Sequence, residues 1–148
     1  MKYNHVPRPA PTAEELVRAE AFAKAHGTEG FGVLRVLGFT GYTEYLPDEA
    51  PPVSGTGIDL GYAMAVDPDH LAVHWLTVLE GRLRKALART KGGTSGWEPA
   101  LADIAAVCTK YDLRWIKLYD IPPQWQASLV LVSRRKHNLD IRFGESRR

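Results

Sequence analysis

The chain of 148 residues has a mass of 16.5 kDa, is 45% hydrophobic and 24% charged, and carries a formal net charge of +2. These values match an ordinary globular domain and exclude a disordered, collagen-like or low-complexity protein. No apolar run approaches the ~18 residues that a membrane span needs. The first residues lack an apolar signal-peptide core, and the single cysteine, Cys108, cannot form an internal disulfide, so we expect a cytoplasmic protein without a membrane anchor.

The first third of the chain is expected to begin with an extended arm. Residues 1–11 contain three prolines, and residues 12–148 are expected to form one domain. The pattern then predicts a capped helix from Thr12 to about Ala25, a β-hairpin over 31–46, a Pro- and Gly-rich loop over 47–57, and a strand over 58–66. The strand is predicted because apolar residues alternate there.

The rest of the chain is expected to contain two helices followed by three strands. Asp67-Pro68-Asp69 is a favourable helix start, and a leucine stripe over 72–87 indicates the buried face of a helix that ends near Thr90. A second helix is predicted over 97–111. The strands are predicted over 113–119, 127–133 and 139–143, with the last two joined as a hairpin through residues 134–138.

The predicted order is therefore α-ββ-β-αα-βββ. Because the helices do not alternate with the strands, a doubly wound parallel sheet is disfavoured. We expect a single α+β domain with a mainly antiparallel mixed sheet covered by two to three helices.

The charges are divided unevenly along the chain. Residues 1–80 hold 5 Lys/Arg and 11 Asp/Glu, whereas residues 81–148 hold 14 Lys/Arg and 6 Asp/Glu. A basic half is suited to phosphates or to an acidic protein surface. It also suits a homo-oligomer that joins an acidic face of one copy to a basic face of the next.

Basic residues form a stripe along the helix that is predicted to end near Thr90. Arg82, Lys85 and Arg89 have the spacing i, i+3, i+7, and Lys91 lies in the glycine-rich loop that follows. Such a row beside a flexible loop is suited to phosphate contacts, although cations at a helix C-terminus also stabilise the helix by themselves. The loop does not have the order of a P-loop.

A second basic group lies at the tip of the predicted C-terminal hairpin. It consists of Arg134, Arg135 and Lys136, with Arg142 in the strand that follows. A basic hairpin tip can enter a nucleic-acid groove and release counterions, and charged tips also keep sheet edges soluble.

The chain has four tryptophans, two of which are candidate contact residues. Trp115, Lys117 and Tyr119 alternate on one face of a predicted strand and can form a platform on which bases stack. Trp125 follows two prolines and is expected to dock on its own domain or on a partner.

The catalytic signals are weak. Asp67, His70 and His74 lie on one side of the predicted helix, and two imidazoles with a carboxylate can hold a divalent metal. However, a fourth ligand is not identifiable, and Asp67 is better explained as a helix cap. Cys108 is expected on the buried stripe of its helix.

We therefore expect a small non-catalytic binding or assembly protein, an accessory or inhibitor-like subunit, with no cofactor. Its basic C-terminal half would contact nucleic acid or an acidic protein surface. One alternative is a small metal-dependent hydrolase or nuclease using Asp67, His70 and His74, and another is a homo-oligomeric structural protein. The expected contact residues are Arg82, Lys85, Arg89, Lys91, Arg134, Arg135, Lys136, Arg142, Trp115 and Trp125.

Overall fold

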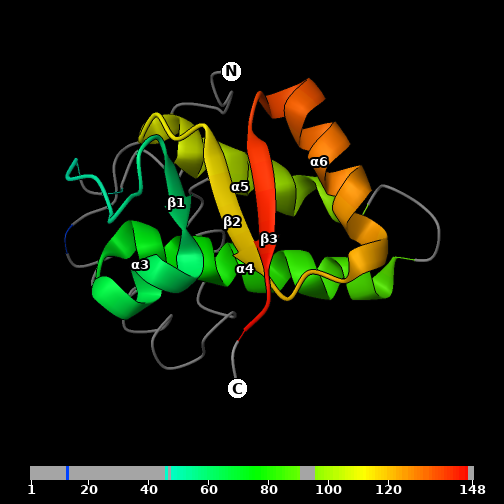
Figure 1. The fold of residues 1–148 in the computed structure, drawn as a ribbon, viewed down its shortest axis with the longest axis horizontal. Coiled ribbons are helices and arrows are strands. Elements are labelled where there is room, and N and C mark those ends of the chain that lie inside the picture. Colours follow the sequence, from blue (N-terminus) through cyan, green and yellow to red (C-terminus); the bar gives the residue numbers. More distant parts are fainter. Residues whose placement is uncertain (1–12, 14–45, 47, 91–95, 147–148) are drawn as a thin grey trace.

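A computed structural model describes residues 13, 46, 48–90 and 96–146 of the chain (Figure 1). The predictions for the arm, the first helix, the hairpin over 31–46, Lys91 and most of its glycine-rich loop lie outside these residues. The elements in chain order are β1 (Gly57–Asp59), α3 (Leu60–Val66), α4 (Leu71–Arg89), α5 (Glu98–Lys110), β2 (Trp115–Tyr119), α6 (Pro123–His137) and β3 (Asp140–Gly144).

The three strands form a sheet in the order β1-β2-β3, and both strand pairs are parallel. The prediction of a mainly antiparallel sheet is therefore wrong, although a single sheet combined with helices was expected. The 20 residues between β2 and β3, residues 120–139, are long enough to form a helical crossover, which a parallel pair requires. This crossover is α6.

The predicted hairpin between 127–133 and 139–143 is consequently wrong as well. Residues 127–133 belong to α6, and residues 134–137 form its last turn. Asn138 ends the helix with φ of 50°, in the left-handed region that asparagine tolerates. The basic group expected at a hairpin tip therefore lies at a helix C-terminus.

The strand predicted over 58–66 is also wrong beyond its first two residues. The Asp59 carboxylate accepts hydrogen bonds from the amides of Gly61 and Tyr62, at 3.0 and 3.2 Å, and so caps α3. The helix buries Leu60 and Ala63, three residues apart, whereas Tyr62, Met64 and Val66 are exposed.

The helices α4 and α5 are close to their predicted positions. The expected stripe of α4 is buried, with Leu76, Leu79 and Leu83 fully inaccessible. The predicted N-cap is wrong, because α4 begins at Leu71 with His70 as its cap, and Asp67 instead ends α3. On α5, Leu101, Ile104 and Cys108 are buried as expected, with Trp97 and Ile58 in the same core.

In Figure 1 the sheet lies in front of α4 and α5, and α6 flanks β3. The inner face of the sheet contributes the aligned residues Ile58, Ile116 and Ile141 to the core, all 3% exposed or less. Among the residues that the structure describes, no helix has the length and apolar character needed to cross a membrane.

Candidate nucleic-acid interface

The outer face of the sheet carries aromatic and cationic side chains that alternate with the buried ones. One row across the strands consists of Gly57, Trp115 and Asp140, and the next consists of Asp59, Lys117 and Arg142. This alternation confirms the period of two expected for β2, since Ile116 and Leu118 point into the core.

Trp115 is held flat against its neighbours. A Cβ atom at Gly57 would lie 2.0 Å from the indole, so this position in β1 must be a glycine for the ring to lie over it. The guanidinium carbon of Arg142 lies 4.1 Å from the indole centroid. Trp115 and Arg142 thus form a cation–π pair on a face of the sheet that also carries Lys117 and Tyr119.

One carboxylate connects this pair to the C-terminus of α6. Arg134 Nη2 lies 3.1 Å from Asp140 Oδ1, and Arg142 Nε lies 3.5 Å from Asp140 Oδ2. Two guanidinium groups share a single carboxylate, so the group of three carries a net positive charge. Both arginine side chains are more than half exposed, at 65% and 52%.

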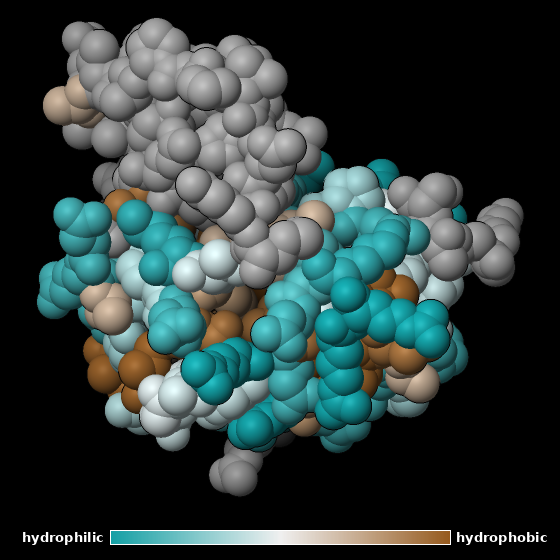
Figure 2. Space-filling model, turned by 90° about the horizontal axis from the view of Figure 1, so that it is seen from above, coloured by the Kyte–Doolittle hydropathy of each residue, from teal (hydrophilic) through white to brown (hydrophobic). Residues whose placement is uncertain are grey.

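Figure 2 views the molecule from above and shows hydrophilic residues over much of the described surface, with hydrophobic areas between them. The amino ends of β2 and β3 are lined by polar and charged residues. A cavity of about 720 Å³ opens there and is lined by Arg114, Arg134, His137 and Asp140 among others. Arg135 and Lys136 lie beside it in the last turn of α6, and Lys136 Nζ lies 2.7 Å from Glu98 Oε2. Cations at this end of a helix are also stabilised by its dipole.

His137 adds a neutral imidazole to this surface. Burial lowers the pKa of His137, and the charge of Lys136 lowers it further, so the ring is uncharged at neutral pH. Its Nδ1 atom is buried and has no hydrogen-bond partner within the described part of the chain.

Of the remaining expected contact residues, the four that the structure describes do not line this cavity. Arg82, Lys85 and Arg89 lie on α4, with Arg82 half-buried and the other two exposed. Trp125 begins α6 and packs edge-on against Trp97, with ring centroids 6.2 Å apart. It therefore docks on its own domain, one of the two alternatives expected for it.

Two residues of the alternative metal site, His70 and Asp67, are engaged elsewhere, and the His74 ring packs edge-on against Trp75. His70 Nδ1 accepts from the Ala72 amide at 3.1 Å, and its Nε2 lies 3.0 Å from the carbonyl oxygen of Glu49. Asp67 ends α3. Within residues 48–90 and 96–146, no three metal-ligating side chains are grouped so that they could hold an ion.

Three participants were missed from the sequence: Asp140, Arg114 and Gly57. Asp140 and Arg114 lie at the starts of neighbouring parallel strands, where the Asp140 amide donates to the Arg114 carbonyl at 2.9 Å. An antiparallel prediction separates these positions, so only the correct topology could have brought them together. The requirement for glycine at position 57 depends on the Trp115 ring and has no local signal.

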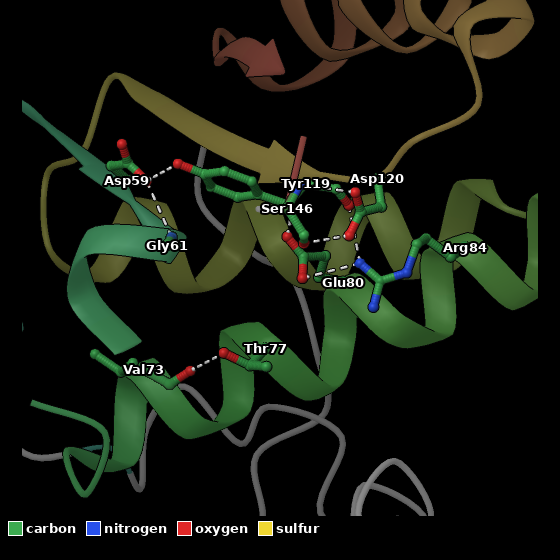
Figure 3. Close-up of polar contacts among 9 residues, drawn as sticks. All are labelled: Asp59, Gly61, Val73, Thr77, Glu80, Arg84, Tyr119, Asp120 and Ser146. Carbon is green, nitrogen blue, oxygen red and sulfur yellow. Dashed lines mark hydrogen bonds and ion pairs between the residues drawn. The ribbon is translucent and has the colours of Figure 1, made fainter. Parts of the chain in front are cut away.

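The opposite, carboxyl edge of the sheet holds a second cavity, of about 550 Å³. Figure 3 shows Glu80 and Arg84 extending from α4 to the end of β2. Glu80 Oε2 accepts from the Tyr119 amide at 2.8 Å, and Arg84 donates to the Tyr119 carbonyl at 2.9 Å. Burial raises the pKa of Glu80, which Tyr119 and Arg84 partly counteract.

Comparisons with known proteins gave no match to a protein-family model, to a curated protein or to a solved structure. The features that bear on function are the two cavities, at the amino and carboxyl ends of the strands, and the outer face of the sheet.

Proposed function

We propose that this chain is a non-catalytic, single-stranded nucleic-acid-binding protein, in which bases stack on the outer face of the sheet. The observation that carries this proposal is the Trp115–Arg142 pair, in which Arg142 shares the Asp140 carboxylate with Arg134. We also propose a cytoplasmic location, which is supported by a lone cysteine that is buried and reduced.

The aromatic content of this face favours a single strand over a duplex. Proteins that bind single strands combine aromatic platforms with a cationic path for the backbone. Trp115 and Tyr119 supply the rings, and Lys117 lies between them on the same face of β2. A duplex keeps its base faces stacked on each other, so its bases cannot stack on the half-buried Trp115 indole.

The cations near Trp115 are able to exchange their partners for phosphates. Ion pairs between exposed side chains are worth only about 0–1 kcal/mol, and Asp140 is already divided between two arginines. A phosphate that binds Arg134 or Arg142 in place of Asp140 therefore breaks only a weak ion pair. Arg114 and Arg135, both exposed, extend the same positive surface.

An acidic protein is the competing partner, and the aromatic ring distinguishes the two. A purely electrostatic surface for a carboxylate-rich protein does not need a glycine opposite an indole. The geometry of Gly57 and Trp115 therefore favours a flat ligand, which a nucleobase provides.

The test measures fluorescence anisotropy of labelled single-stranded RNA, single-stranded DNA and duplex DNA over a salt series. We expect Trp115→Ala to weaken single-strand binding by about 1–3 kcal/mol, roughly 5- to 150-fold, because one stacked base is lost. The joint Arg134→Gln/Arg142→Gln variant should reduce the slope of log K against log salt by about 0.7 for each phosphate contact removed.

Two matched variants serve as controls. Trp125→Ala removes a tryptophan that packs on Trp97 away from the sheet face, and Arg82→Gln/Arg89→Gln removes two cations of α4. Neither should change the affinity more than about twofold. Equal losses in the test and control variants, or tighter binding of duplex than of single strands, would contradict the proposal.

A further inference from the structure

The cavity at the carboxyl edge of the sheet continues the surface on which we propose that bases stack. It is lined by Lys117 and Tyr119 of β2, which also lie on the outer face, and by Gly61, Gly144 and Glu145. Its volume of about 550 Å³ is within the usual range of small-ligand sites, roughly 300–1,000 Å³. A nucleic-acid strand that runs along β2 from Trp115 therefore reaches this cavity at Tyr119.

Tyr119 forms a rigid wall of the cavity. Its ring packs against two glycines, since a Cβ atom at Gly61 or at Gly144 would lie 2.7 Å from a ring atom. Its hydroxyl donates to Asp59 at 2.6 Å, while Glu80 and Arg84 hold its amide and carbonyl. Contacts that fix the hydroxyl and both backbone groups of Tyr119 preorganise its ring for stacking, because binding does not have to immobilise it.

The charge of the lining determines which part of a nucleotide enters. Glu80 and Glu145 line the cavity, and Lys117 lies at its boundary with the sheet face. Arg84 offsets the charge of Glu80, so Glu145 repels phosphate and Lys117 attracts it, and the base enters while the backbone stays outside. Both Glu80 oxygens already have partners on Tyr119 and Arg84, which leaves Glu145, an exposed side chain, as the acceptor for the base.

We propose that this cavity binds a single unstacked base and selects guanine, with Tyr119 stacking on the base and Glu145 accepting its N–H groups. A carboxylate is acceptor-only and has two oxygens. Guanine presents two adjacent donors on its pairing edge, N1–H and the N2 amino group, which match both oxygens at once. This inference rests on the proposed function, because it treats the cavity as the end of the same strand-binding surface.

The experiment uses oligouridine strands that carry one guanosine, adenosine or cytidine at each position in turn. We expect guanosine at one position to tighten binding at least about fivefold over the other bases, since a bidentate contact gives this order of discrimination. Glu145→Gln should abolish the preference, because an amide offers one acceptor and one donor. Binding of plain oligouridine to the same variant measures the separate effect of removing one negative charge, and the base preference is taken relative to it.

Glu49→Gln is the matched control, because Glu49 is exposed and contacts His70 through its backbone carbonyl. A second measurement titrates free guanosine, which has no phosphate, and follows the amide NMR signals of Gly61 and Gly144. Shifts of these signals that Glu145→Gln removes would support the site independently of strand binding.

The outcomes separate the two proposals. Strand binding with no base preference overturns the guanine site and leaves the sheet-face proposal standing. Guanosine shifts without strand binding support the site and overturn the sheet-face function. If neither strands nor guanosine bind, both are overturned.

Discussion

Glu80 lies in α4 with only 6% of its surface exposed, and its partners explain how a carboxylate is kept there. One oxygen accepts from the Tyr119 amide, and the other lies 3.0 Å from Arg84 Nη1. Arg84 in turn donates to the Tyr119 carbonyl. Two side chains one helical turn apart thus bind both backbone groups of Tyr119, which fixes the end of β2 to α4.

The raised pKa of Glu80 predicts a stability change with pH. The folded state binds this proton more tightly than the unfolded state, whose pKa is near 4.5, so the contribution of the group is most favourable below that pH. Stability is then lost as pH rises through the higher folded pKa. We expect Glu80→Gln to flatten this dependence, as measured by urea unfolding from pH 4 to pH 8. An equally steep profile in both proteins would contradict the assignment.

Gly57 gives a prediction about the indole that lies over it. Gly57→Ala places a methyl group where the Trp115 ring now lies, so the ring must move from its position beside Arg142. We expect single-strand affinity to fall by about as much as in Trp115→Ala. In a double-mutant cycle, Gly57→Ala should have little further effect once Trp115 is alanine, because the two changes remove the same contact. Additive losses would show that Gly57 acts through something else.

At the scale of the element, much of the secondary structure could be predicted and its pairing could not. β2, β3, α5 and the buried stripe of α4 lie where local periodicity predicts them. α6 was mistaken for a strand because the segment Leu129–Val132 is apolar and β-branched at two positions. The Pro122-Pro123 pair, which was interpreted as a separator between strands, starts the helix instead.

The burial pattern of α6 distinguishes a helix from the strand that was predicted over these residues. The helix buries Leu129 and Ser133, four residues apart, and exposes Leu131, whereas a strand would place all three on one face. We expect Leu129→Ala to destabilise the protein by about 2–5 kcal/mol and Leu131→Ala by less than about 0.5 kcal/mol. Urea unfolding monitored by circular dichroism measures both. Similar losses in the two variants would contradict the helical assignment.

At the scale of the molecule, the site was predictable only in part, because it is assembled by the parallel topology. The candidates Trp115, Arg134 and Arg142 were identified from composition and alternation. Their connection through Asp140 depends on α6 returning the chain to the start of β3, directly beside the start of β2. Long-range pairing of this kind leaves no trace in local residue patterns.

Cys108 offers a reporter for the stability of the whole fold. It lies in the core at 1% exposure, and burial raises the pKa of its thiol to about 12. We therefore expect almost no reaction with a thiol-specific disulfide reagent at pH 8 in the folded protein, and rapid reaction in urea. The rate across a urea series should follow the unfolding curve. Fast labelling without urea would show that α5 opens locally.

The attachment of Tyr119 to α4 also sets a length. Trp115 and Tyr119 lie four positions apart on an extended strand, about 13 Å at ~3.3 Å per residue, and the side chains of α4 prevent the far end from shifting. The outer face therefore fixes the distance between the two aromatic rings. Oligonucleotides too short to span from the indole to the carboxyl-edge cavity should gain from one ring only, so affinity should rise in a step, not gradually, as nucleotides are added.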